Sequence, residues 1–299
     1  MNNKNSKEKK INIAIIDSGI DAYHPKLFHH INKSKAVSFI ENTSPLIDNL
    51  GHGTEIAGII TKVASNISLT PYKIVERGKA DSLNVIKAII RAVKNKEDII
   101  NLSLGTLKSF NNEEDVKIIK MYQKAIDFAV SNNVIIVSSL GNNNLNLDYQ
   151  LQNNKLVHLP SYFDEVISVG SVNKNNKLSS FTNYYEFRNF LVAQGGDYLI
   201  DNNGEILQNE LIPTTFPTYL DSPLVTSKGL SMTTGCSISA SIVSGTIANI
   251  LNKYDIYNNK KLSVNEIKIE LSKYTNIKHE TFNNHKINYS ILSLNNVTN

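Results

Sequence analysis

The chain of 299 residues contains a single cysteine, Cys236, so it cannot form an internal disulfide bond. It also contains no run approaching the roughly 20 apolar residues that a membrane helix needs, and no lipidation motif. The apolar run Ile11–Ile16 is interrupted by Asn12 and is much shorter than the core of a signal peptide. If Met1 is the natural start, these absences predict a cytoplasmic protein that does not bind membranes.

The chain also lacks a large excess of positive or negative charge. The chain carries 31 basic and 27 acidic residues, a net charge of +4, and its basic residues are scattered rather than clustered. This distribution argues against a nucleic-acid partner but is compatible with a weak preference for acidic peptides. Linkers rich in Pro, Gly or Ser and internal repeats are absent, so we expect one domain over residues 11–299 behind a polar tail of residues 1–10.

Short β-branched runs alternate with helical stretches, a pattern that predicts an α/β fold whose mostly parallel central sheet carries helices on both faces. The predicted strands are Ile11–Asp17, Lys35–Phe39, Leu69–Ile74, Ile99–Leu104, Val134–Ser139 and Val166–Val172. The predicted helices are Thr54–Val63, Ser82–Asn95, Glu113–Asn132, Ser237–Tyr254 and Val264–Tyr274. Apolar residues recur at helical spacing in the second of these helices, and the last one opens with the capping-box pattern Ser263-Val-Asn-Glu266.

Three distant segments carry a carboxylate, an imidazole and a hydroxyl, in the order Asp17, His52 and Ser237. Asp17 ends a strand that is apolar on both faces, at the edge where open parallel sheets place catalytic groups. Each residue alone also has a structural interpretation, as a turn residue, an incidental histidine in a helix-capping turn, or an N-cap. Together they supply what nucleophilic attack on a peptide carbonyl requires.

Two further features favour acyl chemistry. Ser237 begins a helix, whose free N–H groups and dipole stabilise developing negative charge. Asn142 follows a predicted buried strand and offers an amide that can donate to an oxyanion, although a Gly-Asn pair is also a common turn. Cys236 is an alternative nucleophile, but we rank it below Ser237 because buried cysteines are usually inert.

On these residues, the chain resembles the subtilisin-like serine proteases, or subtilases, whose triad has the same chain order. The resemblance runs from about Ile11 to Tyr274 and rests on five motifs: Asp17–Pro25, Gly51–Gly58, Ile100–Gly105, Leu140–Asn142 and the Ser237 segment. It implies a three-layer subtilisin-like fold and a serine endopeptidase. We expect no cofactor and no metal ligand among its site residues, while binding of calcium elsewhere stays open. It also implies that Asp17, His52 and Ser237 form the triad and that Asn142 donates to the oxyanion.

The resemblance further implies how substrate binds. Ser103, Leu104 and Gly105, with the neighbourhood of Arg77–Asp81, would pair with an extended peptide as neighbouring strands do. Leu140 and Gly141 would form the wall of the pocket for the residue before the cut.

Several positions depart from the family pattern. Cys236, Ile238, Ser239 and Ser241 replace residues of the usual Gly-Thr-Ser-Met-Ala segment and its following proline, which we interpret as altered helix packing with activity retained. Glu55 stands where a second histidine is often found. Thr61–Ser68 is too short for the calcium loop of secreted subtilisins. The segment Gly196–Ser231 is longer than usual and can either line the substrate cleft or form a surface loop.

Small size, the absence of signal and propeptide segments, and an Asn-, Lys- and Ile-rich composition resemble the leader peptidases of lantibiotic biosynthesis. The expected partner is then a peptide, with the acidic leader of a modified precursor as the candidate, and the enzyme is expected to be a monomer. A general intracellular degradative subtilase shares every motif. A peptide-binding pseudoprotease would have lost a triad residue, and a nucleotide-binding protein would need a glycine-rich phosphate loop after the first strand.

If the imidazole of His52 has an ordinary pKa, activity should fall below roughly pH 6–7.

Overall fold

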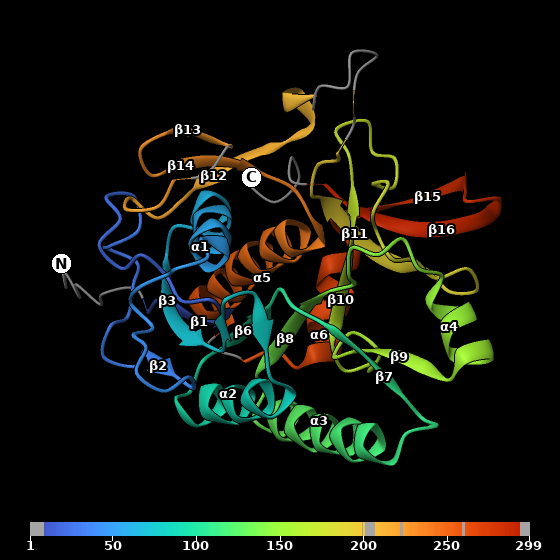
Figure 1. Ribbon diagram of the computed structural model, residues 1–299, viewed down its shortest axis with the longest axis horizontal. Helices are drawn as coiled ribbons and strands as arrows, with labels where there is room; N and C mark the ends of the chain where they lie inside the picture. Colours follow the sequence, from blue (N-terminus) through green and yellow to red (C-terminus); the bar gives the residue numbers. More distant parts are fainter. Residues whose placement is uncertain (1–8, 199, 201–206, 222–223, 259–260, 294–299) are drawn as a thin grey trace.

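The computed structural model describes residues 9–198, 200, 207–221, 224–258 and 261–293. A nine-stranded sheet forms its centre (Figure 1), and all its strands pair in parallel except β15 with β16. From one edge to the other the strands are β15 (Thr275–Phe282), β16 (His285–Leu292), β11 (Phe190–Gln194), β10 (Ile167–Val172), β8 (Ile135–Ser139), β6 (Ile99–Leu102), β1 (Ile11–Asp17), β3 (Ile67–Lys73) and β2 (Val37–Ser38). The mostly parallel sheet confirms the predicted fold class.

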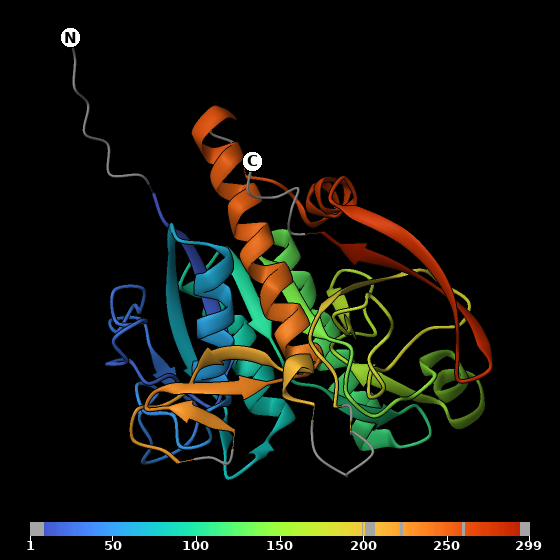
Figure 2. The same ribbon diagram turned by 90° about the horizontal axis from the view of Figure 1, so that it is seen from above.

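Helices cover both faces of this sheet. On one face α1 (His52–Val63), α5 (Cys236–Asn258) and α6 (Val264–Ser272) pack with alternate residues of β1, including Ile13 and Ile15. On the other face α2 (Ser82–Lys94) and α3 (Glu113–Ser131) pack with Ala14 and Ile16. Successive side chains of a strand point to opposite faces, so a run that is apolar throughout buries both. The predicted three layers are therefore present (Figures 1 and 2).

The helix α5 runs through the core beside α1 (Figure 2). Its small residues allow this close approach: a Cβ on Gly245 would lie 2.7 Å from the Cβ of Val63. The capping signals also hold locally. The Asp81 side chain accepts from two N–H groups at the start of α2, and Ser263 and Glu266 form the predicted capping box of α6. Side-chain chemistry thus places the helix starts.

Several elements are absent from the sequence prediction. They are the helix α4 (Leu147–Asn154), the 3-10 turn η1 (Gln208–Glu210), the strands β11, β15 and β16, and the small sheets of β4 (Val75–Glu76) with β5 (Lys79–Ala80), β7 (Thr106–Ser109) with β9 (Leu156–Leu159), and β12 (Ile212–Thr215) with β14 (Leu230–Thr233) and β13 (Val225–Ser227). Most are short or polar on one side. The β15–β16 hairpin turns at Asn283 and Asn284, both with positive φ, which asparagine tolerates in tight hairpins.

The segment Gly196–Ser231, insofar as it is described, does not line the cleft discussed below. Residues 199, 201–206 and 222–223 lie outside the described part. The sheet β12–β14–β13 packs on α1, where Thr214 and Thr215 hydroxyls donate to the carbonyl oxygens of Glu55 and Thr54. The segment therefore supports the helix that begins with His52.

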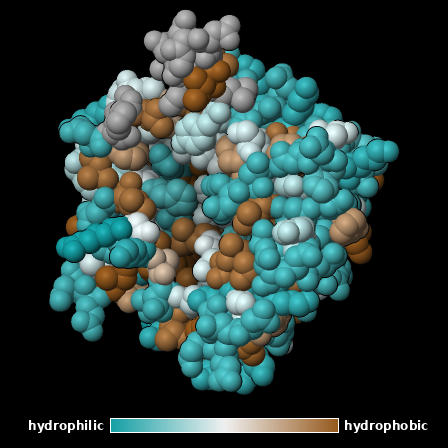
Figure 3. Space-filling view, turned by 45° about the vertical axis from the view of Figure 1, so that its right-hand side comes forward, coloured by the Kyte–Doolittle hydropathy of each residue, from teal (hydrophilic) through white to brown (hydrophobic). Residues whose placement is uncertain are grey.

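In the described ranges no helix is both long and apolar enough to cross a membrane. The face shown in Figure 3 is mostly hydrophilic, with hydrophobic residues scattered around a central hollow. Large exposed side chains such as Tyr23, Phe187 and Ile277 come from separate parts of the chain. Scattered apolar residues of this kind are ordinary on a folded surface.

Candidate active site

Asp17 ends β1, the strand between β6 and β3, and its side chain is 1% exposed. Its Oδ1 accepts a hydrogen bond from the backbone N–H of Ser18 at 2.7 Å. The carboxylate therefore lies at the carboxyl edge of the parallel sheet, as predicted, in a fixed orientation.

His52 is the first residue of α1, and its Nδ1 lies 2.8 Å from Oδ1 and 2.9 Å from Oδ2 of Asp17. Because an ionised carboxylate only accepts hydrogen bonds, Nδ1 carries a proton and donates. In the neutral imidazole Nε2 is then an acceptor, the tautomer that a general base requires. The side chain is 26% exposed, so the ring also reaches solvent.

Asp48 holds the start of this helix, and the sequence interpretation missed it. Its fully buried carboxylate accepts from the backbone N–H groups of Leu50, Gly51 and Thr54 and from the Thr54 hydroxyl. These donors surround His52 in the chain, so Asp48 fixes the backbone that presents the imidazole. An aspartate shortly before a helix start was the available signal.

Ser237 lies in the first turn of α5, and Asn142 follows β8. The Asn142 Oδ1 accepts from the Cys236 N–H at 2.9 Å, which directs its Nδ2 the other way. A Cβ built on Gly235 would lie 3.1 Å from Ser237 Oγ and 3.2 Å from Asn142 Nδ2. The hydroxyl and the amide therefore border one small space, which the absence of a Gly235 side chain keeps open.

Asp17, His52, Asn142 and Ser237 line a single cleft of about 500 Å³. The structure thus brings the four predicted catalytic residues together. Among the hydrogen bonds of the described residues, none joins His52 Nε2 to Ser237 Oγ. Without substrate, catalytic hydrogen bonds are often long and tighten only in the complex.

Cys236 is fully buried, and its Sγ lies 3.2 Å from both Thr182 Oγ1 and the Gly141 carbonyl oxygen. Burial raises the pKa of this thiol to about 12. A thiolate is therefore not available at neutral pH, which supports Ser237 as the nucleophile.

Four of the five predicted substrate-binding residues line the cleft, namely Ser103, Leu104, Gly105 and Gly141. The Ser103 hydroxyl also donates to the Ser237 carbonyl oxygen at 3.2 Å, so it braces the start of α5. Gly78, in the turn between β4 and β5 and within the predicted Arg77–Asp81 neighbourhood, also lines the cleft.

The prediction that Leu140 forms the pocket wall is wrong for its side chain. Leu140 is fully buried in an apolar cluster with Leu147 and Tyr184, and the neighbours Ser139 and Gly141 line the cleft instead. Successive residues of an extended segment face opposite sides, so Leu140 points inward where Gly141 meets the cleft.

The pKa of His52 differs from the ordinary value expected from sequence. Burial lowers it, but the adjoining Asp17 carboxylate, with smaller contributions from Glu55 and Asp48, raises it to about 9. Glu55 accepts a hydrogen bond from the Thr233 hydroxyl at 3.1 Å, and burial raises its pKa to about 7. The site therefore favours the imidazolium, which is the state that forms during attack.

This shift predicts an alkaline pH profile. The general base must be neutral, so kcat/KM should rise with pH and reach half its maximum near pH 9. The profile should be measured between about pH 6 and 10 with a peptide that has no titrating side chain. A midpoint close to the ordinary imidazole value of about 6.5 would contradict the electrostatic assignment.

The Asn142 amide gives a second prediction. In Asn142→Ala, kcat should fall about a hundred- to thousand-fold with little change in KM, the loss seen when subtilisin itself loses this type of donor. Asn143→Ala, one residue further along the cleft, is the matched control and should retain most activity. Equal losses in the two variants would show that the segment acts through its fold alone.

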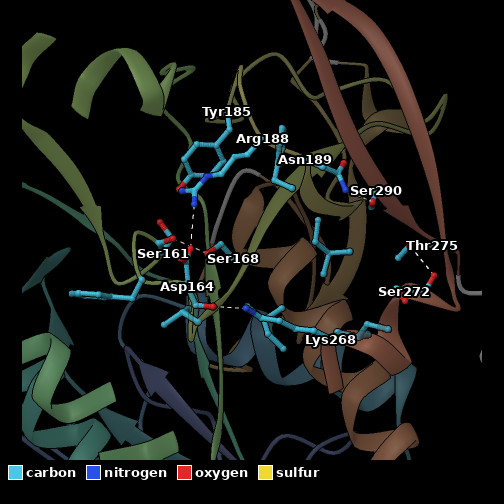
Figure 4. A pocket seen from close by; sticks show the side chains of 16 residues that line it. Ser161, Asp164, Ser168, Tyr185, Arg188, Asn189, Lys268, Ser272, Thr275 and Ser290 are labelled. Carbon is cyan, nitrogen blue, oxygen red and sulfur yellow. Dashed lines mark hydrogen bonds and ion pairs between the residues drawn. The ribbon is translucent and has the colours of Figure 1, made fainter. Parts of the chain in front are cut away.

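A second cavity of about 270 Å³ lies at the starts of β10 and β11, beside α6, and none of the predicted catalytic residues lines it (Figure 4). Its Arg188 guanidinium lies 3.6 Å over the Tyr185 ring and 3.4 Å from the Asp164 carboxylate. Lys268 Nζ donates to the Asp164 carbonyl oxygen. The two cationic side chains of this second cavity therefore already have partners. The candidate active site is the cleft that Asp17 and Ser237 line, at the opposite ends of the strands.

Comparisons with known proteins agree with this geometry. A model of the subtilase family matches residues 8–285. The nisin leader peptide-processing serine protease of Lactococcus lactis subsp. lactis is 29% identical over 293 residues, covering 85% of this chain but 42% of the relative's own length. The major intracellular serine protease of Bacillus subtilis (strain 168) is 31% identical over 287 residues, covering 91% of this chain and 78% of the relative. The crystal structure of a lanthipeptide protease superposes with a TM-score of 0.86 at 31% identity, covering 96% and 86% of the two chains.

Proposed function

The chain belongs to the subtilase family of serine proteases, and we propose that it removes the leader peptide from a lantibiotic-type precursor. The observation that carries the peptidase chemistry is the Asp17–His52 pair in one cleft with Ser237 and Asn142. The likeness to a nisin leader peptidase and to a lanthipeptide protease supports the choice of substrate. A cytoplasmic, monomeric enzyme is part of the proposal.

The first half of the reaction forms a tetrahedral intermediate on the enzyme. His52 Nε2 removes the proton from Ser237 Oγ as the oxygen attacks the peptide carbonyl carbon, and Asp17 stabilises the imidazolium that results. The oxyanion receives hydrogen bonds from Asn142 Nδ2 and from the backbone N–H of Ser237, a first-turn amide with no partner within its helix.

The second half releases both products. His52 gives its proton to the leaving amine, which breaks the carbon–nitrogen bond and leaves an acyl-enzyme. A water molecule then loses a proton to His52 and attacks the ester carbonyl, and Ser237 leaves with that proton. The same imidazole acts as base and acid in turn, which requires the fixed tautomer that Asp17 provides.

A general degradative protease is the second candidate, supported by the 31% identity to the intracellular protease of Bacillus subtilis. The two functions differ in the number of bonds cut. Purified enzyme should be incubated with casein and with a leader-bearing precursor, and the products identified by mass spectrometry. One cut at the leader boundary with casein intact supports the proposal, whereas many fragments from both substrates support degradation. Ser237→Ala serves as the inactive control.

A further inference from the structure

A histidine outside the triad forms part of the wall of the catalytic cleft. His158, on β9, is 5% exposed and lines the same cleft as Ser237. A Cβ on Gly105 would lie 2.3 Å from its Nε2, and a Cβ on Gly141 would lie 2.9 Å from the same atom. A side chain at either position would overlap the imidazole. The two glycines therefore leave room for the ring at the segments that border the nucleophile.

The hydrogen bonds of His158 leave one nitrogen without a partner. Its Nδ1 lies 2.7 Å from the Ser161 Oγ, and that hydroxyl donates to the His158 carbonyl oxygen at 3.0 Å. With its proton on the carbonyl, the hydroxyl accepts from Nδ1–H. The neutral imidazole then presents an unprotonated Nε2, and no described residue donates to it.

The surroundings of His158 hold no charge that would compensate an imidazolium. Burial alone lowers the pKa of His158 to about 4. On β7 and α4, which pack against β9, Lys108 is paired with Asp115, and Asp148 accepts from the backbone N–H groups of Glu186 and Phe187. The remaining titratable groups on and around these elements are Tyr149, Lys155, Tyr162 and Cys236, and across the cleft Asp17 and His52.

We propose that His158 selects the substrate residue immediately before the cut, and that this residue carries a carboxamide or a carboxyl group, as glutamine and glutamate do. The proposal rests on the peptidase function and narrows its substrate class. Asp17, already bound to His52, is the one carboxylate among the described lining residues, so an arginine or lysine side chain finds no counter-charge there. The bare Nε2 can instead accept a hydrogen bond from a glutamine amide.

Glutamate would bind the same nitrogen with one additional proton. Its carboxylate can only accept, so Nε2 must take a proton from solvent and then donate it to the carboxylate oxygen. A buried imidazolium is stabilised by this new negative charge, which raises its pKa in the complex. Binding of glutamate is therefore coupled to proton uptake, whereas binding of glutamine is not.

This coupling has a measurable consequence. Between the pKa of about 4 in the free enzyme and the higher value in the complex, the ratio of kcat/KM for glutamate to kcat/KM for glutamine should rise about tenfold for each pH unit lowered. The titration of His52 affects both substrates equally and cancels in the ratio. The ratio therefore reports on His158 even though activity itself falls with pH.

The test uses the full chain and peptides that differ only in the residue before the cut, which is Gln, Glu, Arg or Leu. We expect the Gln and Glu peptides to be cleaved at least about tenfold faster than the Arg and Leu peptides, since a leucine side chain cannot bond to Nε2 and an arginine finds no free counter-charge in the cleft. Between about pH 8 and 6 the Glu-to-Gln ratio should rise by up to about a hundredfold. A ratio independent of pH, or fastest cleavage after Arg, would overturn the proposal.

Two variants locate the effect. His158→Gln keeps a polar side chain that does not titrate, so the ratio should become independent of pH while the Leu peptide is still cut. Ser161→Ala leaves the imidazole in place but frees Nδ1, and should weaken the pH dependence even if His158→Gln fails to fold. His279→Gln, on the exposed β15 strand, is the matched control and should behave as wild type. Cleavage of no peptide at all would instead count against the peptidase function.

Discussion

Ser237→Ala is expected to lower kcat by about a million-fold, the loss that subtilisin itself shows when its nucleophile is removed. The Ser237 Oγ is the atom that would form the acyl bond, and it borders the space next to Asn142 Nδ2. The small activity that remains should come from the oxyanion donors and substrate binding. Single-turnover kinetics with a peptide substrate would measure it.

A matched control separates chemistry from folding. Ser290→Ala removes a serine hydroxyl in β16 that bonds Asn189 and lies in the second cavity, so it should keep wild-type kcat. Thermal unfolding should show both variants folded. If Ser237→Ala retained wild-type turnover, Ser237 would not be the nucleophile, and the buried Cys236 would not replace it at neutral pH because of its raised pKa.

The parts of the fold that the sequence predicted are those governed by local rules. The strand Ile11–Asp17 is apolar at nearly every position, so its pattern alone indicates burial on both faces and places Asp17 at its end. The start of α6 follows from one capping box. In such segments neighbouring residues carry the information, and no distant contact is needed to interpret them.

The parts that the sequence did not predict depend on contacts between distant segments. His158 has its place in the cleft because β9 pairs with β7, about fifty residues earlier in the chain, which sets its ring against Gly105. Asp48 stands in an irregular loop without periodicity, and its four donors become visible only when the start of α1 is placed. Leu140 was wrongly assigned to the pocket wall, because a motif predicts the path of the backbone but not which of two successive side chains faces the cleft.

The pH prediction was altered by tertiary structure in the same way. An ordinary imidazole pKa was the natural expectation for His52 in isolation. The fold places it against the buried Asp17, 35 residues earlier in the chain, and near Asp48 and Glu55 on either side of it, and these outweigh the effect of burial. The raised pKa of His52 therefore depends on the assembled cleft and does not follow from the Gly51–Thr54 motif alone.

Asp17→Asn is expected to lower kcat by about ten-thousand-fold, as the equivalent change does in serine proteases of another fold. The Ser18 N–H donates to Oδ1, so it should hold the amide oxygen of the new asparagine at that position. The amide nitrogen then takes the Oδ2 position, 2.9 Å from His52 Nδ1, where it donates. This favours a lone pair on Nδ1 and a proton on Nε2, which can no longer accept the proton of Ser237.

The same variant should also move the pH profile, which a purely structural defect would not do. Removing the Asp17 charge removes the largest effect that raises the pKa of His52, so the midpoint of the remaining activity should fall well below 9. Asp21→Asn is the matched control, because Asp21 is equally buried in the next turn but bonds Tyr23 and Thr218 rather than His52. It should lose stability while keeping the alkaline midpoint. A wild-type midpoint in Asp17→Asn would show that the carboxylate does not control the base, and the triad assignment would then lose its electrostatic foundation.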